Sequence, residues 1–181
     1  MIYVFLANGF EETEAIAAID VLRRSEKKVV TVGIGEEVIT SSHGITVVTD
    51  ITEVDAVLSD ELEMIVLPGG MPGTLNLEKN RTVREAIDYC VKNDRYIGAI
   101  CAAPSILGRM GLLEGRKATC FPGFEQFLTG AEFTGEPTEV DGKIVTARGA
   151  GVAVDFGLKL VECLLGKEAA EKIKVSMRCR S

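Results

Sequence analysis

The sequence is short of the residues that build metal sites and disulfide frameworks. His43 is its only histidine, and its five cysteines are widely spaced, with no Cys-x-x-Cys pair. A structural zinc site uses about four Cys or His ligands in closely spaced pairs, so metal catalysis is not expected. An odd number of scattered cysteines is typical of thiols that stay reduced, as they do in the cytoplasm.

Positive charge and long apolar runs are also scarce. Asp and Glu exceed Lys and Arg by seven, and the sequence pI is near 4.9. Because such a chain repels phosphate backbones, nucleic acid is not an expected partner. No stretch approaches the ~18 apolar residues that span a bilayer, and the apolar N-terminus has no basic flank of the signal-peptide kind. We therefore expect a cytoplasmic location and no membrane partner.

Strand-length apolar runs alternate with helical patterns along the chain. Strands are expected over residues 2–7, 29–34, 64–67 and 96–100, and helices over residues 12–24, 82–93 and 104–112. This alternation is typical of an α/β fold with a mainly parallel central sheet and helices on both faces. Because no linker or repeat interrupts it, residues 1–181 are expected to form a single domain.

Two stretches break the alternation and are expected to add short antiparallel hairpins. Residues 38–50 have His43 near their middle, and residues 136–148 contain Asp141-Gly142, a strong two-residue turn signal. At the tip of the first hairpin, His43 is expected to be a solvated turn residue and not a catalytic base. Near the end of the chain, a helix is expected because apolar residues recur four apart: Val152, Phe156, Leu160 and Leu164. This helix should stop at Gly166, and a short final helix should begin at Lys167.

Cys101 is the residue best placed for chemistry. It follows the apolar run 96–100 and precedes Pro104, a residue favoured at the first position of a helix. Its sulfur should therefore lie at a strand-to-helix elbow near free backbone amides, which favour a thiolate. The alternative is an inert buried cysteine, which is our interpretation of Cys90 and Cys163 on apolar helical faces.

Other turns that follow strands should lie at the same edge of the sheet. Gly69-Gly70 could present backbone N–H groups to negative charge beside the sulfur, or could form a tight turn that requires positive φ. Glu11, Glu12 and Glu14 open the first helix, where the helix dipole favours carboxylates whatever their function. The pattern alone does not choose among the three as a general acid or base.

Four segments give the chain a resemblance to the ThiJ/PfpI superfamily. They are LANGFEETE at 6–14, VLPGG at 66–70, AICAAP at 99–104 and TARGAG at 146–151, in the order and spacing of the family. The chain resembles most the branch of the Parkinsonism-associated deglycase (DJ-one) and its bacterial relative YajL. The resemblance implies a flavodoxin-like three-layer sandwich, commonly a homodimer, that works without a cofactor.

The resemblance also implies roles for individual residues. Cys101 would be a nucleophilic, oxidation-sensitive cysteine, and Glu14 a protonated carboxyl hydrogen-bonded to it. Gly69, Gly70 and the amide of Ala102 would line the anion pocket.

Some positions set the chain apart within the superfamily. Arg24 matches a family arginine near the pocket at the dimer contact, and His43 stands where the human branch has an arginine. Phe121 stands where that branch has a histidine, so histidine-assisted catalysis is not expected to carry over. Peptidase members have a histidine directly after the elbow cysteine, and glutamine amidotransferases have one later in the chain. Ala102 and the absence of histidine after His43 disfavour both activities.

The sequence leaves two functional hypotheses. The first is a cysteine-dependent enzyme acting on small reactive carbonyls such as methylglyoxal, or on their early protein adducts, as a glyoxalase or deglycase linked to oxidative stress. The second is a redox sensor or chaperone that uses an oxidisable cysteine without turnover. Both require an accessible, readily ionised thiol, so the sequence does not separate them.

Overall fold

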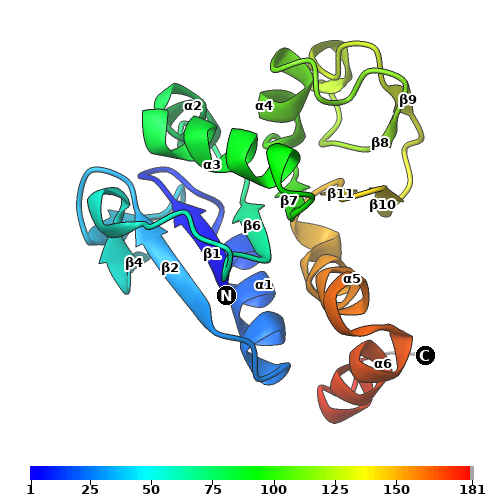
Figure 1. The fold of residues 1–181 in the computed structure, drawn as a ribbon, viewed down its shortest axis with the longest axis horizontal. Coiled ribbons are helices and arrows are strands. Elements are labelled where there is room, and N and C mark those ends of the chain that lie inside the picture. Colours follow the sequence, from blue (N-terminus) through cyan, green and yellow to red (C-terminus); the bar gives the residue numbers. More distant parts are fainter. Residues whose placement is uncertain (180–181) are drawn as a thin grey trace.

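The computed structural model describes residues 1–179, which fold around a seven-stranded sheet (Figure 1). The strand order is β10-β11-β7-β6-β1-β2-β5. All neighbouring strands are parallel except β10, which is antiparallel to β11. The strands are β1 (Ile2–Leu6), β2 (Val29–Gly33), β5 (Ile51–Thr52), β6 (Met64–Leu67), β7 (Tyr96–Ile100), β10 (Thr138–Asp141) and β11 (Ile144–Ala147).

Helices cover both faces of the sheet, which confirms the α/β architecture predicted from the sequence. One face carries α1 (Glu12–Arg24), α5 (Ala153–Leu165) and α6 (Lys167–Ser176), and the other carries α2 (Gly73–Lys79), α3 (Arg81–Lys92) and α4 (Pro104–Arg109). Successive side chains of a strand point to opposite faces, so Val4 packs into the first layer and Phe5 into the second. Both are fully buried, which explains why the strands read as continuous apolar runs. Within residues 1–179, no helix has both the length and the apolar character needed to cross a membrane.

Both predicted hairpins are present. β3 (Val38–Thr40) and β4 (Thr46–Val48) pair antiparallel on either side of His43, and β10 and β11 are joined at Asp141-Gly142. The second hairpin is more than a peripheral addition, because β11 also pairs in parallel with β7 and is buried along its length. It therefore extends the main sheet on the side of Cys101.

The structure corrects several element boundaries. α4 ends at Arg109 instead of reaching Leu112, and Gly111 at φ +72° reverses the chain soon afterwards. The helix expected around Phe156 does stop at Gly166, whose φ is +85°. Three features had no pattern to predict them: the short helix α2, the two-residue strand β5, and a small pair formed by β8 (Lys117–Ala118) and β9 (Glu132–Phe133).

Candidate functional site

Cys101 lies at a sharp turn between β7 and α4, as the sequence predicted. Its φ is +65°, an uncommon conformation for a residue other than glycine that costs about 1–3 kcal/mol. Hydrogen bonds hold the turn on both sides: the Cys101 N–H donates to the Ala147 carbonyl and the Phe121 N–H donates to the Cys101 carbonyl, each at 2.8 Å. Because Pro104 then begins α4, the thiol is held at the carboxyl edge of the sheet, where ligands of such folds bind.

Glu14 is the carboxyl that faces this thiol. The Glu11 side chain caps α1 by accepting the Glu14 N–H at 2.7 Å, which places Glu14 in the first helical turn with only 1% of its surface exposed. Its Oε2 accepts the Gly69 N–H at 2.9 Å. Within residues 1–179, its Oε1 has no hydrogen-bond partner of ordinary geometry, although Cys101 and the Ala150 N–H lie close enough to affect its pKa. One oxygen is thus available for proton transfer.

The three glutamates of α1 have separate roles, which the sequence pattern could not assign. Glu11 forms the cap, Glu14 faces Cys101, and Glu12 forms an ion pair of 2.8 Å with His43 Nδ1. The possible ligand atoms of Glu11, Glu12 and His43 lie within 4.8 Å of one another. The cap and the ion pair account for this proximity, so we assign no metal to the cluster.

The thiol and the carboxyl titrate as a coupled pair. Burial raises the pKa of Glu14 to about 7, against the opposing effects of Cys101 and the Gly69 N–H. Burial and the charge of Glu14 raise the pKa of Cys101, while the Ala102 and Gly70 amides act to lower it. We interpret this as a pair in which Glu14 loses its proton near pH 7 and its charge then makes the Cys101 thiol harder to ionise. The amides at the elbow thus act in the predicted direction, toward the thiolate, while burial and the charge of Glu14 act against it.

Gly69 and Gly70, which follow β6, have different roles in the site. The Gly69 N–H is used by Glu14, so this amide does not serve the anion pocket that the resemblance implied. A methyl group at Gly69 would lie 2.6 Å from Cys101 Cβ and 2.7 Å from Glu14 Oε2, so only glycine lets the two side chains meet. Gly70 has φ +89°, and its backbone N–H and that of Ala102 both act to lower the pKa of Cys101. These two amides are therefore the candidates left for the anion pocket.

Phe121 forms a wall of the site to which the sequence assigned no function. A methyl group at Gly149 would lie 3.3 Å from Phe121 Cδ2 and 4.0 Å from Cys101 Sγ, so the ring edge and the sulfur flank the same point. The Phe121 side chain is 46% exposed, which leaves apolar surface beside the thiol. The only signal in the sequence was that phenylalanine replaces a histidine of the related branch.

Arg24 and His43 do not meet at the thiol within one chain. Arg24 ends α1, ten residues beyond Glu14 and thus roughly 15 Å along the helix, and its Nε donates to Asp20 at 2.8 Å. His43 is exposed at the hairpin tip, as predicted, and its contact with Glu12 places it near the rim of the site.

The remaining cysteines are free but not equally shielded. Cys90 and Cys120 are buried, and burial raises the pKa of each thiol to about 12. Cys163 and Cys179 are only partly buried. The prediction of full burial therefore holds for Cys90 and is wrong for Cys163, which lies near the outer end of α5 beside the half-exposed Leu165.

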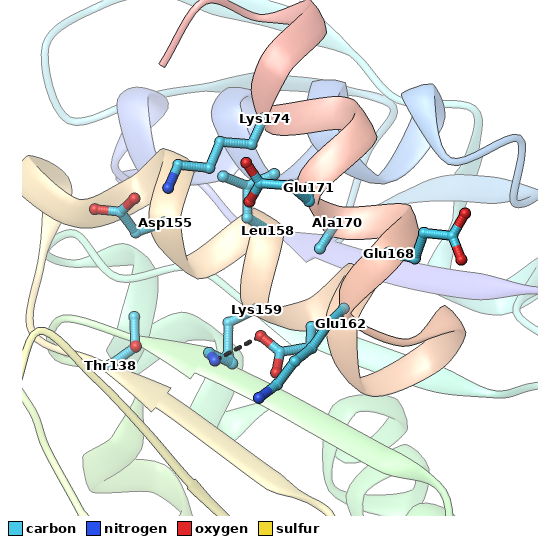
Figure 2. Close-up of a pocket in the computed structure, with 10 residues that line it drawn as sticks. Thr138, Asp155, Leu158, Lys159, Glu162, Glu168, Ala170, Glu171 and Lys174 are labelled. Carbon is cyan, nitrogen blue, oxygen red and sulfur yellow. Dashed lines mark hydrogen bonds and ion pairs between the residues drawn. The ribbon is translucent and has the colours of Figure 1, made fainter. Parts of the chain in front are cut away.

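A wide hollow of about 580 Å³ lies elsewhere, between α5, α6 and β10 (Figure 2). Its lining mixes both charges, and on its α5 side Lys159 Nζ donates to Glu162 Oε2 at 2.7 Å. It is lined by Thr138, Asp155, Leu158, Lys159, Glu162, Lys167, Glu168, Ala170, Glu171 and Lys174, which include no thiol and no buried carboxyl. Its size alone does not make it a reaction site.

Comparison with known proteins places this site in a family context. Residues 1–163 match the model of the DJ-1/PfpI family. The chain is 39% identical to Protein DJ-1 homolog B of Arabidopsis thaliana over 93% of its own length, which is 39% of the length of that relative. It is 32% identical to the glutathione-independent glyoxalase DJR-1.2 of Caenorhabditis elegans, covering 90% of this chain and 87% of that one.

The fold has the same relatives. The crystal structure of Drosophila melanogaster DJ-1beta superposes with a TM-score of 0.92 at 32% identity, covering 99% of this chain and 98% of that one. By sequence the same fly protein is 36% identical over 94% of this chain and 92% of its own length. The chain thus spans less than half of the Arabidopsis relative and nearly all of the insect relative.

Proposed function

The chain belongs to the DJ-1/PfpI family, and from this we propose that it is a cysteine-dependent enzyme that converts small reactive carbonyls without a cofactor. The observation that carries the proposal is the thiol of Cys101 beside Glu14, a buried carboxyl with one unpartnered oxygen. The glyoxalase name of the C. elegans relative supports carbonyls as the substrate class. Early protein adducts of the same carbonyls fall within the proposal, as does a cytoplasmic location, where thiols stay reduced.

The proposed reaction begins with attack of the Cys101 sulfur on the aldehyde carbon of methylglyoxal, which gives a hemithioacetal. The Gly70 and Ala102 amides hold the negative charge that develops on oxygen. Glu14 then removes the proton from that carbon and delivers it to the neighbouring carbon. The hemithioacetal hydroxyl gives up its proton while the neighbouring carbonyl oxygen gains one, which leaves a lactoyl thioester. Water cleaves the thioester to lactate and the free thiol. One carbon is oxidised and its neighbour reduced, so no external oxidant is consumed.

The direct test is to incubate the purified protein with methylglyoxal in buffer free of glutathione and to measure lactate. We expect lactate in proportion to enzyme concentration and well above the buffer rate. Lactate formation no faster than in buffer would contradict the proposal, whatever thiol adducts mass spectrometry detects.

Phe121 should favour substrates with an apolar substituent. Replacing Phe121 with alanine is expected to lower kcat/KM for phenylglyoxal relative to glyoxal by about fivefold, because an aromatic pair is worth roughly 0.5–1.5 kcal/mol. Phe133→Ala is the matched control, since Phe133 is similarly exposed but lies on β9. Steady-state assays with both aldehydes give the ratio. An equal change in the two variants would remove Phe121 from the substrate pocket.

We also propose a homodimer that uses α1 and the β3–β4 hairpin. Ile16 and Val48 are exposed, and they line a shared hollow of about 220 Å³ with Ile19 and Val47. Apolar surface on a helix face and an adjoining hairpin suits an isologous contact with a second copy. Such a contact could bring Arg24 or His43 of one copy toward the site of the other.

Sedimentation at micromolar concentration should give twice the 19.4 kDa mass of the chain. Val48→Lys should weaken association at least about a hundredfold, since it buries a charge twice in a symmetric interface. Val54→Lys is the control, because Val54 is also exposed but lies in a different segment. A wild-type protein that sediments only as a monomer would refute the dimer.

Redox sensing is the second candidate, and one feature favours it. The Glu14 carboxyl, whose Oε1 has no hydrogen-bond partner within residues 1–179, lies beside the thiol. A protonated carboxyl there would hold an oxygen of an oxidised sulfur. Turnover and oxidation would both use Cys101 and Glu14, so substitutions of Glu14 should affect both.

A further inference from the structure

A second hollow of about 320 Å³ lies at the opposite edge of the sheet from Cys101. Ile97 and Ile144, near the starts of β7 and β11, line it together with residues at the end of α3 and the loop after α4. Because β7 runs from Tyr96 to Ile100 at about 3.3 Å per residue, this hollow lies roughly 15 Å from the thiol. It is separate from the site proposed for carbonyl chemistry.

The lining of this hollow is apolar inside and cationic at the rim. Ile144 and Leu112 contribute the apolar wall, and Val91 adds a half-exposed side chain. The charged lining residues are three cations and one acid: Arg95, Arg116, Lys143 and Asp94. In a chain with net charge −7, this is a local excess of positive charge.

The three cations are not equally neutralised. Arg116 pairs with Asp141 at 3.0 Å, and Lys143 pairs with the exposed Asp94 at a longer 3.5 Å. Among residues 1–179, no carboxylate lies within salt-bridge distance of Arg95, whose Nη2 donates only to the Asp60 carbonyl at 3.3 Å. Its Nε is buried and has no acceptor within the described residues. Among residues 1–179, Arg95 is thus the lining cation without a carboxylate partner, and a ligand carboxylate at the rim is the group that best pairs with its guanidinium.

We propose that this hollow binds a small organic acid with an apolar body. The carboxylate would lie at the rim against Arg95 and Lys143, and the hydrocarbon would cover Leu112 and Ile144. The volume is at the lower end of ligand sites and accommodates on the order of ten non-hydrogen atoms. A ligand of that size should bind with a Kd of roughly 0.1–1 mM.

The test is titration of the ¹⁵N-labelled full chain with octanoate, with 1-octanol and octylammonium as probes of matched length. Octanoate should shift the amides of Val91, Ile97 and Gly142 and leave Cys101 and Phe121 unmoved. The alcohol and the amine should bind at least about tenfold more weakly, because they lack the carboxylate. Equal binding of all three probes, or octanoate shifts centred on another surface, would overturn the proposal.

Variants at the rim separate charge from fold. Lys143→Gln and Arg95→Lys should each weaken octanoate binding at least about threefold, the second because it keeps the charge but loses the paired N–H donors of the guanidinium. Lys92→Gln is the control, since Lys92 is exposed near Val91 but does not line the hollow. If Lys92→Gln weakens binding as much as Lys143→Gln, the attraction is general and the site is refuted. Carbonyl turnover plays no part in this readout.

Discussion

Replacing Cys101 with alanine should lower lactate release from methylglyoxal by at least about a thousandfold, to the rate in buffer. The effect is large because the sulfur forms the covalent bond on which every later step depends. The substitution should leave the fold intact, since alanine keeps the Cβ and both backbone hydrogen bonds that pin the turn. Circular dichroism and the melting temperature check this independently of activity.

Cys163→Ala is the matched control, because Cys163 is also a free and partly buried thiol but lies on α5. It should retain wild-type turnover. Alkylation of the wild type with iodoacetamide at neutral pH should modify Cys101 first and Cys179 slowly, while the buried Cys90 and Cys120 stay unmodified. Lactate release that survives in Cys101→Ala would place the chemistry at another residue.

The sequence predicts the position of the elbow because the elbow is built from local signals. A continuous apolar run ends at Ile100, Cys101 follows at once, and Pro104 begins a helix. The same kind of signal predicts most of the strands and helices and both hairpins, since each of these depends on periodicity or turn chemistry within a few residues. It does not predict α2 or β5, which are too short to show a period.

The sequence alone does not predict which side chains from distant segments contact each other. Glu11 and Glu14 are three residues apart at the start of α1, but only the contact of Glu14 with Gly69, 55 residues away, shows which of them reaches Cys101. The Gly69 N–H points at Glu14 and not at the anion pocket, because backbone direction depends on dihedral angles that residue type does not fix. Phe121 reaches the thiol from a loop after β8 that has no periodic pattern.

Glu14→Gln should lower lactate release by about 10²–10⁴-fold, because glutamine keeps the shape of the side chain but cannot carry the proton between the two carbons. The pH dependence of thiol alkylation should change as well. In the wild type, the rate should show a step near pH 7, above which it rises less steeply, because ionised Glu14 opposes ionisation of the thiol. The glutamine variant has no such carboxyl, so this step should disappear. Glu14→Asp keeps the carboxyl at shorter reach and should keep a displaced step.

The ionisation of Glu14 should also make the stability of the fold depend on pH. The folded-state pKa of Glu14 is raised from 4.5 to about 7, so the folded protein prefers the protonated form. That preference stabilises the fold fully below pH 4.5 and is lost as the pH rises to about 7. Glutamine does not ionise and so avoids this loss. At pH 8 the free energy of unfolding of Glu14→Gln should exceed that of the wild type by up to about 3 kcal/mol, with a smaller difference at pH 5, as measured by denaturant titration.

Glu14 should also direct the oxidation of Cys101 when the protein is treated with increasing amounts of peroxide. A protonated carboxyl beside the sulfur can donate to one oxygen of a sulfinate, which should make the sulfinate the stable product in the wild type. Glu14→Asp should shift the distribution of oxidation states, and Glu14→Gln should shift it further. Peptide mass spectrometry on the three proteins measures this, and Glu12→Gln is the control because Glu12 pairs with His43 instead. If turnover, alkylation profile and oxidation products are the same in all of them, Glu14 has no part in the chemistry and Cys101 acts without it.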